Sequence, residues 1–405
     1  MKPSGIEWIG DIPDDWEVRR GKYTLDLLMR PIRDNDEIIT CFRDGQVTRR
    51  SNRREDGFTF ADKEIGYQGI LKGDLVIHGM DGFAGAIGIS DSDGKGSPVL
   101  NVCRPKNGSD TRYINYYLRT LALQNVFIAL STGIRERSCD LRWKKIAELL
   151  FTIPPLKTQQ KIADYLDEKC GEIDATIAKQ KESIEKLKAY KQSLISETVT
   201  KGLDKSAPLK PSGIDYLGDI PSHWEIKKLK FLVSLIDNKT KDGHSISLEN
   251  IESGTGKLIE TENTYDGEGI SFKENDLLFG KLRPYLAKVY LSALKGRALG
   301  DFYVMRANKG TNPNFLKFVL LSDWFIKIVD SSTYGTKMPR ASWDFTGGMR
   351  IPLPPISEQD CISSYLEIKC SEVDTFIIEK QNIIQKLDAY KKSLIFECVT
   401  GKTEL

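Results

Sequence analysis

Histidine, net charge and long apolar runs are all scarce in this sequence, and each scarcity argues against a class of protein. Only three histidines occur, His78, His223 and His244, and no histidine-based metal site or nucleophile arrangement stands out. No apolar run approaches the ~20 residues that span a bilayer, and the first residues lack a signal-peptide pattern. The 59 basic and 57 acidic side chains leave a net charge of only +2, so any basic character must be local. We therefore expect a cytoplasmic protein of ordinary globular domains.

Cysteine is present, but without a metal-binding or disulfide pattern. The seven cysteines are scattered and form no CxxC motif, which argues against a disulfide framework and a zinc site. Catalytic motifs are missing as well. No GxxxxGK[ST] phosphate loop is present, and the Pro-Pro pairs in TIPPL and PLPPI do not fit the Asn/Asp-Pro-Pro-aromatic motif of an adenine methyltransferase. The sequence therefore predicts neither an enzyme nor a metal or cofactor site in this chain.

What the sequence does contain is an internal repeat. Residues 153–200 and 353–400 align at an offset of 200, with 23 of 48 positions identical. Each copy begins with a Pro-Pro pair, which disfavours a helix before it, and then continues without proline or glycine except for Gly171. Each copy is therefore predicted to form one long helix.

Apolar side chains recur along both copies at heptad positions a and d, which predicts that the two helices pair along a narrow seam. Polar residues interrupt this seam at Gln180/Lys380 and Lys191/Lys391, where they reduce stability but fix the register. Two copies related by a two-fold axis should pack antiparallel, each about 60 Å long at 1.5 Å per residue. A helix pair of purely structural use is the alternative reading. The residues expected to pair the helices are Ala163, Leu166, Cys170, Ile173, Ile177, Ile184, Leu187 and Leu194 in the first copy, and Leu366, Cys370, Val373, Ile377, Ile384, Leu387 and Leu394 in the second.

A shorter repeat, the cap, precedes each long helix. Residues 2–22 match residues 210–230 with 12 of 21 positions identical, so the chain consists of two tandem halves. Because the second helix stops where a further cap would follow, we expect the two termini to lie close together. The predicted segments are 1–152 for the N-terminal cap and first variable domain, 153–203 for the first long helix, 204–352 for the linker, second cap and second variable domain, and 353–405 for the second long helix.

The two variable regions differ in sequence but share a coarse pattern. Each has short apolar strands, one of them beginning at Asp74 or Asp276, then an amphipathic helix near 111–128 or 313–329. A polar, basic loop and a last strand lead to the Pro-Pro pair. The predicted fold class is α+β: a tandem pseudo-two-fold repeat of two mixed α/β domains, separated by a pair of long antiparallel coiled-coil helices.

Basic and hydroxyl side chains gather in the predicted loops of both halves. Such loops suit phosphate contact, and Arg or Lys can also donate to guanine O6 and N7. Any one cluster is more often a solvated surface, but recurrence at matching places favours DNA binding. The candidates are Arg19, Arg20, Lys22, Arg43, Arg49, Arg50, Arg53, Arg54, Ser131, Thr132, Gly133, Arg135 and Arg137 in the first half, and Lys227, Lys228, Lys281, Arg283, Tyr334, Gly335, Thr336, Lys337 and Arg340 in the second.

Together these features resemble the specificity (S) subunit of type I restriction-modification systems, over essentially the whole chain. The resemblance rests on the GDIPxxW caps at 10–16 and 218–224, on the IPPL or LPPI helix entries followed by Gln159 or Gln359, and on the helix endings. It implies two target-recognition domains that each bind one part of a bipartite DNA site. It also implies two methyltransferase (M) subunits docked on the helices and caps, and restriction (R) subunits that join for cleavage.

The resemblance further implies that this chain performs no chemistry. N6-adenine methylation with S-adenosylmethionine, and cleavage with ATP and Mg, would belong to the partner subunits. The cap-to-helix distances differ by eight residues, 138 from Trp16 to Pro154 and 130 from Trp224 to Pro354, so the two domains should read different sequences in an asymmetric site. The alternative is a coiled-coil DNA-binding scaffold or regulator without methyltransferase partners.

Overall fold

The computed structural model describes residues 1–53, 65–129, 141–259, 267–335 and 338–405. The chain divides into two compact units: unit 1 comprises 1–180 and 382–405, and unit 2 comprises 181–381. Each unit therefore combines one half of the first long helix with one half of the second. None of the helices in the described ranges is both long enough and apolar enough to cross a membrane.

Unit 1 is built on a four-stranded antiparallel sheet in the order β4-β11-β8-β9, with α2 packed on it. Side chains of α2 such as Tyr117 and Leu118 share a core with sheet residues such as Leu75 and Ile87. Smaller strand pairs are β1-β2, β3-β12, β5-β6 and β7-β10. The elements are β1 (Lys2–Pro3), β2 (Asp11–Ile12), β3 (Glu17–Arg20), α1 (Gly21–Thr24), β4 (Leu25–Leu27), β5 (Ile39–Cys41), β6 (Val47–Arg49), η1 (Arg50–Asn52), β7 (Gln68–Ile70), β8 (Leu75–His78), η2 (Gly82–Ala84), β9 (Ile87–Ile89), β10 (Gly94–Gly96), β11 (Leu100–Pro105), α2 (Thr111–Leu123), α3 (Val126–Ala129), α4 (Trp143–Ile146) and β12 (Leu150–Ile153).

Unit 2 repeats this plan with the antiparallel sheet β16-β23-β20-β21, covered by α7. Its second sheet is larger, with the order β17-β19-β22-β18 and one parallel pair, β18-β22. The elements are β13 (Leu209–Pro211), β14 (Asp219–Pro221), β15 (Glu225–Lys228), α6 (Leu229–Leu232), β16 (Val233–Ile236), β17 (Lys239–Thr240), β18 (His244–Ile246), η3 (Leu248–Asn250), β19 (Gly269–Phe272), β20 (Asp276–Gly280), η4 (Pro284–Leu286), β21 (Val289–Leu291), β22 (Gly296–Ala298), β23 (Phe302–Ala307), α7 (Pro313–Leu321), α8 (Asp323–Ser331), α9 (Trp343–Gly348) and β24 (Arg350–Leu353).

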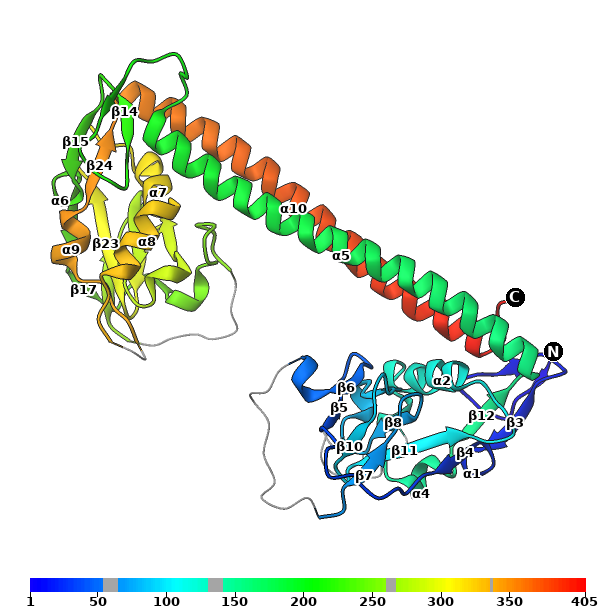
Figure 1. Ribbon diagram of the computed structural model, residues 1–405. Coiled ribbons are helices and arrows are strands. Elements are labelled where there is room, and N and C mark those ends of the chain that lie inside the picture. Colours follow the sequence, from blue (N-terminus) through cyan, green and yellow to red (C-terminus); the bar gives the residue numbers. More distant parts are fainter. Residues whose placement is uncertain (54–64, 130–140, 260–266, 336–337) are drawn as a thin grey trace. The chain divides into compact units, whose positions relative to one another are not determined.

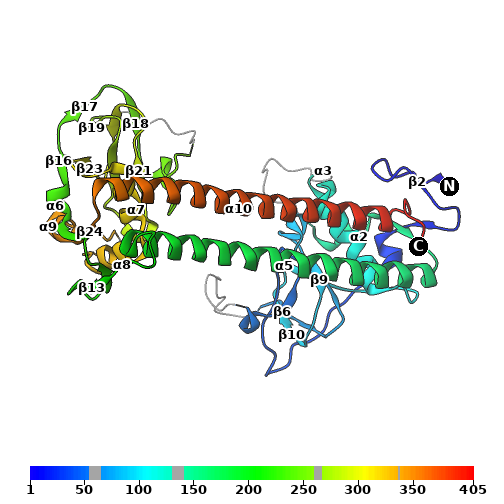
Figure 2. The same cartoon turned by 90° about the horizontal axis from the view of Figure 1, so that it is seen from above.

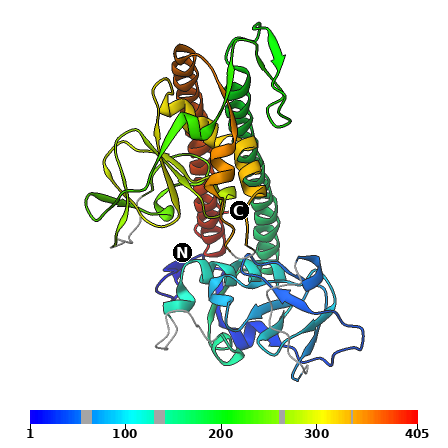
Figure 3. The ribbon, with the colours of Figure 1, turned by 90° about the vertical axis from the view of Figure 1, so that its left-hand side faces the viewer.

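The predicted long helices are α5 (Leu156–Lys201) and α10 (Ile356–Val399), and in each unit their halves run antiparallel. In unit 1 the Lys391 ammonium lies 2.6 Å from the Asp174 carboxylate, and in unit 2 the Lys191 ammonium lies 2.7 Å from that of Asp374. Figure 1 shows α5 in green beside α10 in orange to red, and Figures 2 and 3 show the same pairing. The prediction of paired antiparallel helices is confirmed within each unit.

The predicted helix after the sheet is interrupted in both units. In unit 1 it divides into α2 and α3 because Asn125 is left-handed, with φ of 57°, a conformation that asparagine tolerates better than most residues. In unit 2 it divides into α7 and α8 at Ser322, which is extended at φ −64° and ψ 145°. The prediction of one continuous helix was wrong in both cases, since single interrupting residues hardly alter the apolar periodicity.

The first cap joins the two ends of the chain within unit 1. The Lys402 ammonium donates to the carbonyl of Asp11 at 2.7 Å, and Gly401, with φ of 70°, packs against Trp16. At the other cap Gly202, with φ of 74°, packs against Trp224 in the same way. N and C accordingly lie close together in Figure 1, which confirms the expectation for the termini.

Candidate nucleic-acid interface

In unit 1 three of the predicted arginines line one groove. Arg43, Arg50 and Arg53 border a hollow of about 780 Å³, together with residues of β5 and the end of β8. The Arg53 guanidinium lies 4.2 Å above the Phe42 ring, a cation–π contact that fixes its direction. The groove thus offers several oriented N–H donors on one surface of the unit.

Carboxylates that were not predicted share this groove with the arginines. Arg43 lies 2.8 Å from Asp81, and Arg53 lies 2.6 Å from Asp44. Partial burial opposes ionisation of Asp44, but the hydrogen bond from Arg53 holds the pKa of this carboxyl below its usual value. Donors and acceptors therefore lie next to one another in the groove, an arrangement suited to reading base edges as well as phosphates.

His78, which was not among the predicted candidates, also lines the groove. Its Nδ1 accepts from the backbone N–H groups of Met80 and Asp81, at 3.3 and 2.9 Å. Burial lowers the pKa of His78, outweighing the attraction of Asp81. The neutral imidazole therefore shapes the turn between β8 and β9.

In unit 2 two of the predicted basic loops meet. Isolated antiparallel β-bridges pair the backbone of Arg340 with that of Leu282 and of Tyr334. They join the loop after β20 to the loop after α8. Asp301 lies between them, with its carboxylate 2.9 Å from Arg340 and 4.0 Å from Lys281. Tyr334 is 80% exposed beside this cluster, so an aromatic face is available next to the cations. The other predicted residues of these loops are Arg283, whose N–H donates to Pro339, and Gly335, with φ of 101°.

The two clusters share one equivalent part of the fold. In unit 1 the Leu141 N–H donates to the Gly79 carbonyl at 2.8 Å, and in unit 2 the Ala341 N–H donates to the Lys281 carbonyl at 2.9 Å. The same backbone link thus holds the turn after β8 or β20 against the loop before α4 or α9. Because the side chains on this shared frame differ, the units present different chemistry from one architecture.

Other predicted basic residues lie away from these clusters. Arg20 and Lys22 both contact Glu148, at 2.7 and 2.9 Å, while Arg19 contacts Glu17. In unit 2, Lys227 contacts Glu225 on the equivalent strand β15, Lys228 is exposed at its end, and in unit 1 Arg49 contacts Glu37. The predicted candidates Arg54, Ser131, Thr132, Gly133, Arg135, Arg137, Thr336 and Lys337 lie outside the described residues.

The predicted helix-pairing residues lie along the seam between α5 and α10 within each unit. Lys191 is only 8% exposed there, so its contact with Asp374 supplies the charge partner that a buried ammonium requires. Buried seam residues are Ala163, Leu166, Cys170, Ile173, Ile177 and Ile184 of α5 and Leu366, Cys370, Val373 and Leu394 of α10, while Leu187, Leu194, Ile377, Ile384 and Leu387 are partly buried.

The repeated glutamines attach the start of α2 to α5 and the start of α7 to α10. Gln159 accepts from the N–H of Asp110, which caps α2, and donates to the Pro154 carbonyl. Gln359 makes the equivalent bonds to Asn312 and Pro354. These contacts explain why the glutamine follows the Pro-Pro pair in both copies.

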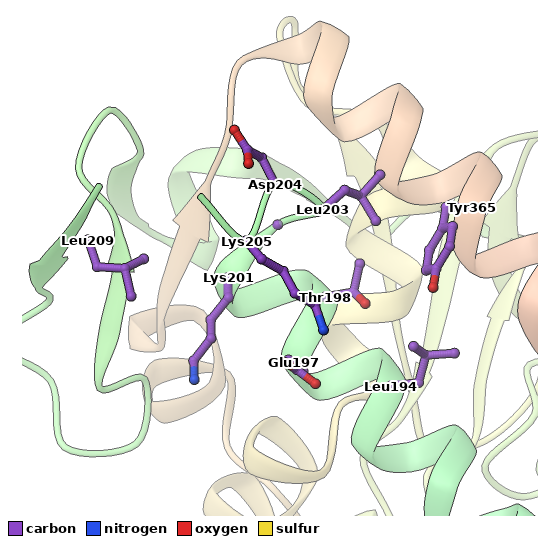
Figure 4. A pocket seen from close by; sticks show the side chains of 10 residues that line it. Leu194, Glu197, Thr198, Lys201, Leu203, Asp204, Lys205, Leu209 and Tyr365 are labelled. Carbon is purple, nitrogen blue, oxygen red and sulfur yellow. The ribbon is translucent and has the colours of Figure 1, made fainter. Parts of the chain in front are cut away.

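A separate hollow of about 270 Å³ lies at the C-terminal end of α5 in unit 2. It lies on the linker between the halves, apart from the arginine groove of unit 1 and the Lys281–Arg340 cluster of unit 2. Figure 4 shows Tyr365 of α10 facing it, together with α5 and linker residues of both charges. The mixed lining favours no ligand of one charge, and the described residues contain no cluster suited to a metal ion. The remaining lining residues are Leu194, Glu197, Thr198, Lys201, Gly202, Leu203, Asp204, Lys205 and Leu209.

Comparison with known proteins agrees with this architecture. Residues 51–188 match the family model of the type I restriction modification DNA specificity domain. A Methanocaldococcus jannaschii protein assigned as the MjaX type I restriction enzyme specificity subunit is 23% identical over 97% of this chain and 95% of its own length. The MjaVIII specificity subunit of the same organism is 26% identical over 64% of this chain and 63% of its own length.

Solved structures show the same fold. A chain from a study of complex assembly and conformational transition of the type I R-M system has a TM-score of 0.74 at 12% identity, covering 97% of this chain and 100% of its own. The crystal structure of the HsdS subunit from Thermoanaerobacter tengcongensis has a TM-score of 0.53 at 15% identity, covering 97% and 98%. This chain is thus similar in sequence to type I restriction enzyme specificity subunits and shares its fold with these solved type I chains.

Proposed function

We propose that this chain gives a type I restriction-modification complex its DNA specificity, and that units 1 and 2 read different parts of a bipartite, asymmetric site. One observation carries this proposal. The same turn and loop are linked by the same backbone bond in both units, yet these segments carry Asp81 in unit 1 and Lys281 and Arg340 in unit 2. A shared frame with exchanged side chains is what two related readers of different sequences require.

The ion pairs of these clusters suit base recognition. Exposed pairs contribute only about 0–1 kcal/mol each, so DNA can replace them with little loss. Once released, an arginine can donate to guanine O6 and N7, and a carboxylate can accept from cytosine N4. The chain carries only +2 overall, so the cations of these loops act through their local field.

The proposal assigns the chemistry to partners. Two M subunits would dock on this chain and bind S-adenosylmethionine for N6-adenine methylation, and R subunits would use ATP and Mg for cleavage. The chain itself would recognise DNA without catalysing a reaction, in the cytoplasm. The motif content supports this assignment, since the sequence has neither a phosphate loop nor the methyltransferase motif.

A map of N6-methyladenine across the genome tests the proposal. Cells carrying this gene with its neighbouring methyltransferase gene should show a bipartite, asymmetric methylated motif, and cells lacking only this gene should lose it. A motif that survives the deletion would refute the assignment. The alternative, a scaffold or regulator, predicts no stable co-purification with a methyltransferase, so recovery of the two together would exclude it.

A further inference from the structure

We infer that an inward-facing cation in each unit, which does not touch DNA, positions the recognition loops and so determines specificity at one half of the site. In unit 1 this positioning residue is Arg119, and in unit 2 it is Lys288. The inference rests on the proposed function.

Arg119 ties three segments of unit 1 together. From α2 its Nη1 donates to the carbonyls of Gly85 and Ile87, each at 3.1 Å, just before and within β9. The guanidinium also fills the space beside Gly45, where an added Cβ would lie 1.4 Å from Nη1. Gly45, in the turn between β5 and β6, has φ of 93°. Residues other than glycine rarely adopt this backbone conformation.

The packing around this turn leaves no spare room. A Cβ at Gly88 would lie 2.0 Å from the Gly45 carbonyl oxygen, and one at Gly85 would lie 2.6 Å from that of Arg43. The turn carries Arg43 and Asp44 into the groove of unit 1. A change in the side chain beneath the turn must therefore move the groups that line the groove.

In unit 2 a different residue, at a different place in the fold, positions the loops. Leu321 stands at the position of α7 that corresponds to Arg119 of α2, and it packs near Gly256. Lys288, which precedes β21, donates instead to the carbonyls of Leu248 and Ile251, at 2.8 and 2.7 Å. It thereby fastens η3 to the turn after β20. Because the hydrogen bonds of Arg119 lie in unit 1 and those of Lys288 lie in unit 2, each cation acts on its own unit.

Base discrimination depends on this kind of positioning. A bidentate contact discriminates against a wrong base only when both of its hydrogen bonds are held in line, and recognition groups held less firmly by their supporting residues lose that advantage. Loss of one such contact should reduce discrimination about tenfold, within the range typical of a base contact. Removing Arg119 should therefore relax one half of the DNA site without affecting the other.

Methylation by the complex of this chain with its methyltransferase partner tests the inference. The substrates are DNA duplexes carrying the native site or single-base changes in either half. Arg119→Met should lower discrimination about tenfold in one half only. Lys288→Met, the matched variant, should do so in the other half only. Arg119→Lys, which keeps the charge but not the fork of donors, should restore part of the discrimination.

The inference is overturned if Arg119→Met slows methylation of every duplex by the same factor, since that is the signature of a merely structural residue. It is also overturned if the two methionine variants relax the same half. Should Arg119→Met fail to fold, Gly45→Ala and Arg119→Lys carry the test, and native discrimination by both would refute it. A wild-type complex without sequence preference would instead refute the proposed function.

Discussion

A buried aspartate stands just before β8 in unit 1 and at the start of β20 in unit 2. Loss of its arginine partner should destabilise the two units by different amounts. In unit 2, Asp276 is 1% exposed and accepts from Nε and Nη2 of Arg306, at 2.8 and 2.7 Å. In unit 1, Asp74 is 0% exposed and accepts from both Arg104 and Arg30. Among the described residues, truncation of Arg306 thus leaves a buried carboxylate without a cation, whereas truncation of Arg104 leaves one in place.

The size of the effect follows from burial. Removing one partner of a buried ion pair costs about 3–5 kcal/mol, because the remaining charge stays buried without compensation. The Arg306 side chain is 40% exposed, so water can replace part of it, and Arg306→Met should lower the free energy of unfolding of unit 2 by about 3 kcal/mol. Arg104→Met should lower that of unit 1 by only about 1 kcal/mol, because Arg30 remains.

Native-state hydrogen exchange measured by mass spectrometry can separate the two units, with peptides from β20 and β23 reporting on unit 2 and peptides from β8 and β11 on unit 1. The control is Arg30→Met combined with Arg104→Met, which should bring the loss in unit 1 to about 3 kcal/mol. Equal losses for the two single variants, with no further loss in the double variant, would refute the reasoning.

Other contacts predict changes in stability and in its pH dependence. Asp374→Asn should destabilise unit 2 by about 2 kcal/mol, since the seam residue Lys191 loses its carboxylate partner, and unchanged hydrogen exchange in unit 2 would contradict this. Gln159→Ala should cost about 1–3 kcal/mol in a urea melt, because the N–H of Asp110 loses its acceptor, and a loss below 0.5 kcal/mol would show that water replaces the bond. Burial lowers the pKa of His78, so the native state binds fewer protons than the unfolded chain between the two pKa values. Its contribution to stability should be complete above about pH 6.5 and decline as the pH falls through the lowered value. His78→Gln should flatten that slope in urea melts at pH 5–7, and an unchanged slope would exclude His78 as its source.

The repeats made much of the fold accessible from the sequence. Because each element of one half must recur in the other, weak patterns such as the strands beginning at Asp74 and Asp276 could be checked against each other, and both strands are present. The long helices followed from heptads uninterrupted by proline. The helix breaks at Asn125 and Ser322 did not follow, since single residues decide them.

The two basic clusters could be predicted from the sequence only in part. Basic residues could be counted in the sequence, but the carboxylates that pair with them could not be assigned. Asp81 reaches Arg43 across 38 residues, and Asp301 reaches Arg340 across 39, through the turns of the sheets. Arg119 was hidden for another reason. It lies on an amphipathic helix where a long basic residue ordinarily faces water, and only the fold reveals the carbonyls to which it donates.

The division of both long helices between the units has a consequence for synthesis. Unit 2 is one continuous stretch, 181–381, but unit 1 is completed only by 382–405. At about 5–20 residues per second, the ribosome reaches these last residues roughly 10–40 s after finishing 180. During that interval Ile173 and Ile177 lack the α10 residues of their core, such as Leu394 and Cys398. The half translated first is thus the last to be completed, and a chain stopped near 381 would keep unit 2 while exposing the apolar seam of unit 1.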